Sequence, residues 1–164
     1  MSAFYADGGA AQSSATDDWA TPQCVVDFAL ARFNLHQYYD LDACASDSNH
    51  KAPGYYTADD DGLQQPWFGN VWLNPPYGRT IGDWVNKAVE SIAEPSGDCL
   101  SVTLCIPART DTRWFHRLIE NGAEVVFIKG RLKFGNGKNA APFPSCLVYL
   151  KRGQKIVHTT YEVI

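Results

Sequence analysis

The chain has 164 residues, of which 45% are hydrophobic and 13% aromatic, enough for one globular domain with a buried core. No apolar run approaches the roughly 18 residues that cross a bilayer, and the N-terminus lacks the pattern of a secretory signal. Five scattered cysteines without a C-x-x-C pair disfavour a disulfide framework and a zinc site, so we expect reduced thiols, a cytoplasmic protein and no metal.

The net charge of −4 is divided unevenly along the chain. Residues 1–100 hold 4 Lys/Arg and 14 Asp/Glu, a net charge of −10, whereas residues 101–164 hold 10 and 4, a net charge of +6. This asymmetry indicates one face for a polyanion and another for a cationic or neutral ligand. The alternative is that the two halves interleave in space and their charges mix.

The first half of the chain predicts few regular elements. Residues 1–16 are rich in Ser, Ala and Gly without periodicity, which predicts a disordered tail before a single domain over residues 17–164. Thr21 is the expected N-cap of a helix that reaches Phe33 at helical spacing. A short strand is expected over residues 38–45. An irregular stretch then carries the acidic triplet Asp59-Asp60-Asp61.

The second half alternates apolar runs with amphipathic segments. The predicted strands are residues 71–73, 100–106, 124–128 and 146–150, and the predicted helices are residues 84–92 and 114–119. This order predicts an α/β domain with a mainly parallel sheet and helices on both faces. In such sheets ligands bind beyond the carboxyl ends of the strands, where both Asp42 and Asn74 are expected.

The tetrapeptide Asn74-Pro75-Pro76-Tyr77 ends the run 71–73 and precedes Gly78. Proline has no N–H for a strand ladder and holds the preceding residue in extended backbone, so the strand should stop at Asn74. The two prolines make a stiff loop that presents an amide, a free carbonyl and an aromatic ring in fixed order. The alternative interpretation is an ordinary strand-ending turn with an exposed Tyr77.

Such a loop suits a planar substrate that carries an exocyclic NH₂ group. The N6 amine of adenine is a poor nucleophile because its lone pair is delocalised into the ring. Asn74 Oδ1 and the Pro75 carbonyl would accept from its two N–H bonds and localise that lone pair without reorganisation. Tyr77 would stack on the base, which must first be flipped out of a duplex. We therefore expect Asn74, Pro75, Pro76 and Tyr77 to form a catalytic loop.

Several segments match a known family when they are taken in order. Asp18-Trp19-Ala20-Thr21-Pro22, then Leu41-Asp42-Ala43-Cys44-Ala45-Ser46, then the Asn74 loop resemble amino-methyltransferases that use S-adenosyl-L-methionine. More narrowly, the chain resembles the small phage and prophage DNA N6-adenine methyltransferase (Dam-like) family, also in residues 104–116, 130–135 and 141–145. The resemblance implies a minimal version of the Rossmann-like class I methyltransferase fold.

The resemblance also implies which residues meet the cofactor. Thr21 and Pro22 match the segment at its methionine part, Asp42 and its neighbours match the loop after the first strand, and Trp67 is expected beside the adenosyl part. The expected cofactor-binding residues are Trp19, Thr21, Pro22, Asp42, Cys44, Ala45, Asp60 and Asp61. The loop after Asp42 lacks the usual glycines, and only about thirty residues separate it from Asn74. Each of these residues also has an alternative interpretation. Asp42 would cap a turn at the end of its strand, and the acidic run would form a solvated turn. The tryptophans would only pack in the core or a lid.

Basic residues gather after the predicted strand that ends near Pro107. Arg113 and Arg117 continue a four-residue spacing that begins at Arg109, and Arg131 and Lys133 flank Leu132 on one face of an extended segment. Solvated surface is the alternative for each. The expected DNA-binding residues are Arg79, Arg109, Arg113, Arg131 and Lys133.

Together these patterns predict a DNA adenine-N6 methyltransferase that transfers a methyl group from S-adenosylmethionine to a flipped adenine. The alternatives are a methyltransferase for protein glutamine or RNA, and a catalytically idle DNA-binding relative. The expected partner is DNA in a bacterial host cytoplasm, with no membrane, and a homodimer is left open.

Overall fold

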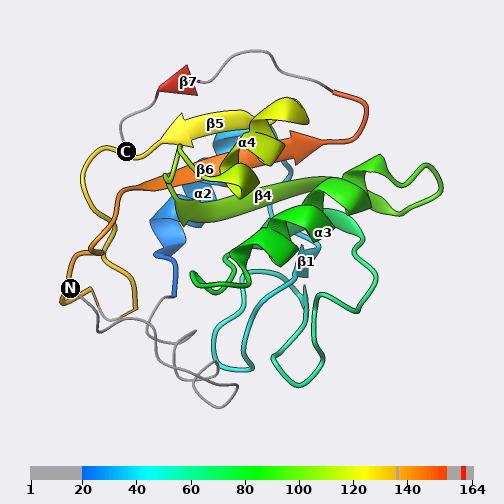
Figure 1. Cartoon of the computed structure of the whole chain (residues 1–164). Helices are drawn as coiled ribbons and strands as arrows, with labels where there is room; N and C mark the ends of the chain where they lie inside the picture. Colours follow the sequence, from blue (N-terminus) through cyan, green and yellow to red (C-terminus); the bar gives the residue numbers. More distant parts are fainter. Residues whose placement is uncertain (1–19, 136, 155–159, 162–164) are drawn as a thin grey trace.

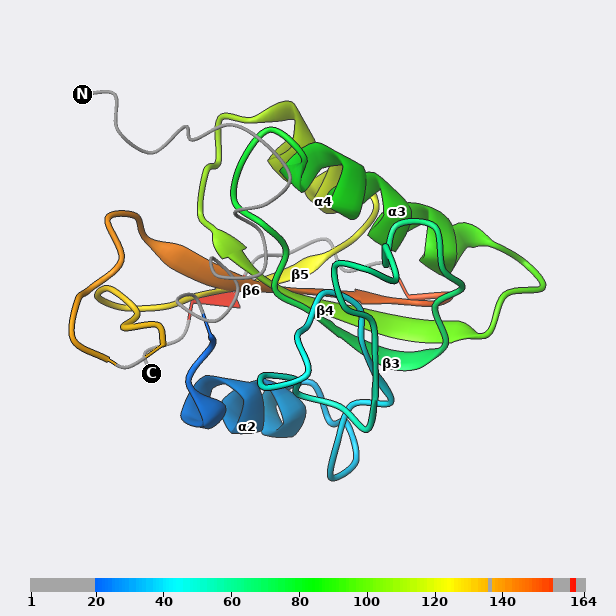
Figure 2. The same ribbon diagram turned by 90° about the horizontal axis from the view of Figure 1, so that it is seen from below.

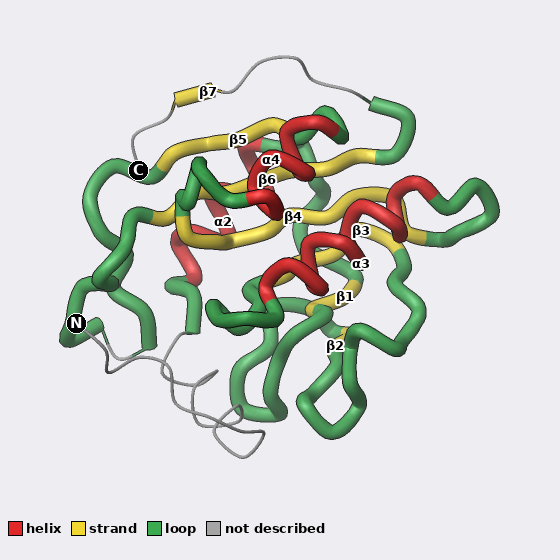
Figure 3. The backbone as a smooth tube through the Cα atoms, viewed as in Figure 1, coloured by secondary structure: helices red, strands yellow, loops and turns green. Residues whose placement is uncertain are grey.

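The computed structural model describes residues 20–135, 137–154 and 160–161. Trp19 and the tail predicted over residues 1–16 therefore lie outside the described residues. The described chain forms one twisted sheet with helices on both sides (Figures 1 and 3). The predicted α/β class is confirmed.

The sheet has seven strands in the order β2-β1-β3-β4-β6-β5-β7. Of these described strands, only β6 runs antiparallel to its neighbours, so the sheet is mainly parallel, as predicted. The strands are β1 (Leu41–Asp42), β2 (Gly54–Tyr55), β3 (Gly69–Leu73), β4 (Cys99–Pro107), β5 (Glu124–Phe127), β6 (Ser145–Lys151) and β7 (Thr160–Tyr161).

Helix α2 (Gln23–Arg32) covers one face of the sheet, while α3 (Ile81–Ala93) and α4 (Arg113–Glu120) cover the other (Figure 2). Successive residues of a strand point to opposite faces. In β3, Val71 and Leu73 accordingly pack with α3 and α4, whereas Trp72 packs with α2. No helix among the described residues is long and apolar enough to span a membrane.

The chain between β1 and β3 contains no helix, and its one strand, β2, was not predicted. The strand expected over residues 38–45 shrinks to the two residues of β1. Its early end has a local cause, because the Asp42 carboxylate accepts hydrogen bonds from the amides of Cys44 (3.3 Å) and Lys51 (2.9 Å). The chain is thereby folded back instead of continuing a ladder.

The start of α2 also differs from the expected one. Pro22, not Thr21, occupies the N-cap position, and no side chain caps the helix. Thr21 lies one residue further from the helix than an N-cap does, so its hydroxyl is not used by the first turn. It lines a small cavity instead, as described below.

Candidate active site

The parallel pairing of β1 with β3 brings two distant segments to one edge of the sheet. Leu41 pairs with Val71 and Asp42 with Trp72, so the loops that begin at Ala43 and Asn74 leave the sheet side by side. Both loops lie beyond the carboxyl ends of parallel strands, where ligands of open α/β sheets bind.

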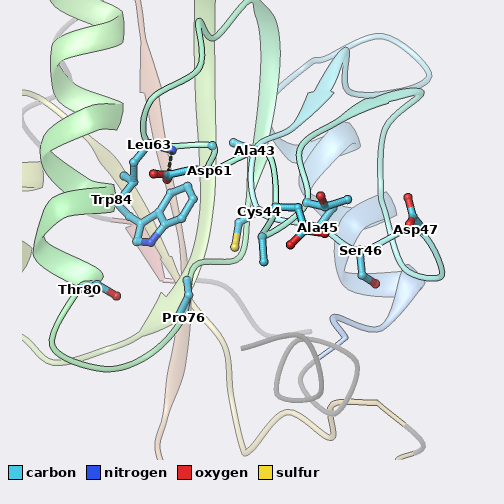
Figure 4. A pocket seen from close by; sticks show the side chains of 14 residues that line it. Ala43, Cys44, Ala45, Ser46, Asp47, Asp61, Leu63, Pro76, Thr80 and Trp84 are labelled. Carbon is cyan, nitrogen blue, oxygen red and sulfur yellow. Dashed lines mark hydrogen bonds between the residues drawn. The ribbon is translucent and has the colours of Figure 1, made fainter. Parts of the chain in front are cut away.

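A cavity of about 410 Å³ lies between these loops and the start of α3. Figure 4 shows Cys44 and Pro76 on its wall, with Trp84 and Thr80 facing it from α3 and its N-cap. The remaining wall comes from residues 43, 45–47, 57–59 and 61–63, which include the acidic residues Asp47, Asp59 and Asp61. An aromatic ring and several acidic residues therefore line one cleft of ligand size.

The wall formed by residues 57–63 is held in place by buried indole rings. The Trp67 indole N–H donates to the Gly62 carbonyl at 2.8 Å, and the Trp67 ring stacks on Trp84 with centroids 6.3 Å apart. A Cβ atom on Gly62 would lie 2.1 Å from the carbonyl oxygen of Ala43, so only glycine allows this close approach. Trp67 thus supports the cavity from behind and does not line it.

The acidic triplet splits into two roles. Asp60 Oδ2 accepts from both the amide and the hydroxyl of Thr57 at 2.8 Å, and these bonds hold the pKa of Asp60 below its usual range. Asp60 closes a turn and does not line the cavity. Asp61 does line it, with a φ of 54° that L-residues rarely adopt. Of the two carboxylates expected at the cofactor, Asp61 is therefore the better candidate.

Asp42 is buried at the end of β1, with 3% of its surface exposed. Burial raises the pKa of its carboxyl to about 7, although the amides of Lys51 and Cys44 and the Lys51 charge oppose the shift. The neighbouring Cys44 thiol has its pKa raised to about 12 by burial and by the Asp42 charge. Cys44 is therefore a small apolar wall residue rather than a nucleophile.

A second cavity of about 20 Å³, room for about one water molecule, joins Asp42 to the catalytic loop predicted from the sequence. Thr21, Asp42 and Asn74 line it, and Cys44 lines both this cavity and the larger one. The Thr21 hydroxyl is buried beside the Cys105 thiol and makes no other hydrogen bond with the described residues. Thr21 thus carries a polar atom suited to a ligand at this position.

The predicted catalytic loop is tied into the sheet through Tyr77. The Tyr77 hydroxyl lies 2.5 Å from Asn74 Oδ1 and 3.1 Å from the carbonyl oxygen of Cys105 in β4. The Tyr77 ring makes edge contacts with Phe143 and Phe134, with centroids 5.2 and 6.2 Å apart. Tyr77 is therefore not an exposed turn residue, and its polar end points into the protein.

The expected DNA-binding residues all lie on the surface. The exposed Arg131 and Lys133 alternate with the buried Leu132 and Phe134, so their segment is anchored by one face and charged on the other. Arg79, Arg109 and Arg113 are also exposed. Because Phe134 contacts Tyr77, the segment after β5 adjoins the Asn74 loop.

Sequence reasoning missed several residues that line the large cavity. Trp84 has the helical spacing of a core residue and indeed packs in the core, so no pattern marks its second role. Thr80, Ser46 and Asp47 are ordinary loop residues in sequence. Trp67 is expected beside the cofactor but reaches the cavity only through Gly62 and Trp84. Pro22, Pro75 and Tyr77 line neither cavity.

The fold is a Rossmann-like α/β domain with its cavities at the carboxyl edge of the sheet. The family model described as "DNA N-6-adenine-methyltransferase (Dam)" matches residues 8–149. The chain belongs to this family, and the resemblance seen in the sequence is confirmed.

Two phage proteins named DNA N-6-adenine-methyltransferase are similar to this chain. The protein of Escherichia phage T1 is 34% identical over 118 residues, which cover 71% of this chain and 46% of that protein. The protein of Haemophilus phage HP1 is 30% identical over 129 residues, 77% of this chain and 71% of that protein. The match thus spans about half the length of the T1 protein.

Among solved structures, a predicted O-methyltransferase, protein Atu636 from Agrobacterium tumefaciens, aligns with a TM-score of 0.37 and 22% identity. The alignment covers 64% of this chain and 45% of that one.

The buried Asp42 carboxyl predicts a distinct pH dependence of stability. Its pKa is about 7 when folded and about 3.9 when unfolded, so the native state keeps a proton that the unfolded chain has lost. The resulting stabilisation is complete below the unfolded pKa and is lost as the pH rises through 7, by up to about 1.4 kcal/mol per pH unit. Thermal unfolding at pH 5 and pH 8 measures this effect. The melting temperature of Asp42→Asn should rise relative to that of the unsubstituted protein as the pH rises.

The control variant is Asp59→Asn, which replaces an exposed carboxylate. If the melting temperatures of the unsubstituted protein and of Asp42→Asn changed equally with pH, Asp42 would be ionised throughout and the prediction would be wrong.

Proposed function

We propose that this protein is a DNA adenine-N6 methyltransferase that takes its methyl group from S-adenosylmethionine. The observation that carries the proposal is the position of the Asn74 loop. Asn74 lines the small cavity and Pro76 lines the large one, at the carboxyl edge of a Rossmann-like sheet. Family membership over residues 8–149 supports the adenine amine as the acceptor.

The large cavity fits a nucleoside cofactor with a positive charge. Its volume of about 410 Å³ lies within the usual range of roughly 300–1,000 Å³ for ligand pockets. The Trp84 ring offers an apolar surface for the adenine, and the carboxylates of Asp59 and Asp61 are acceptors for ribose hydroxyls or the adenine amino group. When bound, the cofactor supplies an electrophilic methyl group on a sulfonium sulfur.

The small cavity holds only about one water molecule and is too small for the methionine end of that cofactor, but the polar groups that line it suit contacts with that end. The buried Thr21 hydroxyl can donate to a carboxylate, and the Asp42 carboxylate can accept from an ammonium. Cys44, which lines both cavities, marks where the two parts of the cofactor would meet. Asn74 lines the same small cavity, so it would lie near the methyl group that the cofactor supplies.

The catalytic loop would activate the target amine without a general base. Asn74 Oδ1 and the Pro75 carbonyl accept from the two N–H bonds and stabilise the charge that develops as the nitrogen attacks. The bound cofactor would supply the methyl group, and the methylated amine would then lose one proton to solvent. The prolines keep these two dipoles in place before the base arrives.

DNA would approach over the segment that carries Arg131 and Lys133. A paired adenine cannot reach the Asn74 loop, so the base has to be flipped out of the duplex. The exposed Arg79, next to the loop, would contact a phosphate near the flipped nucleotide. A homodimer remains a prediction.

Replacement of Asn74 by alanine should abolish most methyl transfer to DNA. Loss of one preorganised acceptor should lower kcat by roughly 10²–10³-fold and leave cofactor affinity within a few fold. The measurement is transfer of labelled methyl groups to DNA, tRNA and a glutamine peptide side by side. Asn86→Ala, an exposed amide on α3, is the control and should be fully active. Labelling of tRNA or peptide in place of DNA would favour the alternative substrates, and no labelling at all would leave an idle DNA-binding protein.

Gly62→Ala tests the assignment of the large cavity. The added Cβ would collide with the Ala43 backbone carbonyl, so the wall should move and the Kd for S-adenosylmethionine should rise about tenfold or more in calorimetry. Gly82→Ala, also near the cavity but facing open space, should bind normally. Equal affinities for all three proteins would place the cofactor elsewhere.

Removal of two charges from the segment after β5 tests the DNA face. The double variant Arg131→Ala with Lys133→Ala should weaken DNA binding for all sequences. It should also lower the slope of log affinity against log salt concentration by about 2, because about two phosphate contacts are lost. The matched double variant, Lys87→Ala with Lys151→Ala, removes the same charge from helix α3 and from the end of β6. If both double variants lost DNA affinity equally, the affinity would depend only on the net charge of the protein. The segment after β5 would then be wrongly assigned as the DNA-binding surface.

A further inference from the structure

The Tyr77 hydroxyl sits between two oxygen atoms. As placed, it is 2.5 Å from Asn74 Oδ1 and 3.1 Å from the Cys105 carbonyl oxygen. A phenol has one proton and can donate one hydrogen bond. Whichever oxygen receives that proton, the other faces the hydroxyl oxygen at close range without a hydrogen between them.

A half-turn of the Asn74 amide removes this conflict. The two ends of an amide have the same shape, and the hydrogen-bond network decides which end faces a neighbour. With the NH₂ end towards Tyr77, the amide donates to the hydroxyl oxygen and the hydroxyl donates to Cys105. Both contacts are then hydrogen bonds, and Oδ1 turns away from Tyr77.

We propose that Tyr77 is a positioning residue whose hydroxyl fixes the Asn74 amide with its oxygen towards the reacting amine. In this arrangement the NH₂ end of Asn74 is held by Tyr77, and Tyr77 is held by the Cys105 carbonyl. The inference rests on the proposed function, because it explains how Asn74 presents an acceptor rather than a donor.

The surroundings of Tyr77 suit an anchor. Burial raises the pKa of Tyr77 well above its usual value, so the hydroxyl stays protonated and can always donate to Cys105. Phe143 and Phe134 pack edge-on against the ring and limit its movement. Cys105 belongs to β4, which pairs with β3 on one side and β6 on the other. The amide is thus tied to the interior of the sheet.

The test separates the hydroxyl of Tyr77 from its ring. Tyr77→Phe keeps any stacking on a base and removes only the hydroxyl, so kcat for DNA methylation should fall about tenfold with unchanged KM for DNA and Kd for the cofactor. In an Asn74→Ala background the same change should have no further effect, because the hydroxyl acts through Asn74. An unchanged kcat for Tyr77→Phe, or an equal loss in both backgrounds, would overturn the proposal.

A second measurement does not depend on catalysis. The melting temperatures of Tyr77→Phe, Asn74→Ala and the double variant should be non-additive, because the two groups share one hydrogen bond. The exposed Tyr38 supplies the control. The change in melting temperature caused by Tyr38→Phe should add to the change caused by Asn74→Ala. Additive melting shifts for Tyr77 would refute the pairing. If the unsubstituted protein transferred no methyl group to DNA, the proposed function would fail while this cycle still decided the role of Tyr77.

Discussion

The pairing of β1 with β3 is the constraint on which the candidate site depends. β1 has only two residues, yet its register opposite Val71 and Trp72 sets the loop after Asp42 beside the loop after Leu73. The Asp42 carboxylate then binds two later backbone amides and folds the chain back towards β2. Both cavities exist because these two turns leave the same edge of the sheet. A carboxylate buried at this point costs stability near neutral pH, and the cost coincides with the place where a cationic ligand is proposed to bind.

The parts of this structure that the sequence predicts are those fixed by local chemistry. Long apolar runs identify β4 and β6, and two consecutive prolines stop β3 at Asn74. The remaining features depend on contacts between distant residues. Adjacent carboxylates look alike in sequence, but Asp60 turns to Thr57 while Asp61 faces the cavity. Trp84 serves both core and cavity, and helical spacing reveals only the first role.

The uneven charge along the chain places acidic and basic residues at different positions at the carboxyl edge of the sheet. The acidic first half supplies Asp47, Asp59 and Asp61 to the large cavity, where a positively charged cofactor is proposed. The basic second half supplies the exposed Arg131 and Lys133 on the segment that contacts Tyr77 through Phe134. Acidic residues thus line the large cavity, and two basic residues lie on the segment that contacts Tyr77. Electrostatics would draw each ligand to its own side of the Asn74 loop.

A fixed acceptor requires control of both the backbone and the side chain. Pro75 and Pro76 restrict the backbone around Asn74, but prolines cannot decide which end of an amide faces the substrate. The orientation of the amide has to be fixed by a hydrogen-bond partner from elsewhere in the fold. The Tyr77 hydroxyl, which lies between Asn74 and Cys105, is proposed to be that partner. The four-residue loop therefore combines local stiffness with an anchor on a central strand. On this view Tyr77 belongs to the loop for its hydroxyl as much as for its ring, because preorganisation fails if the amide is free to turn.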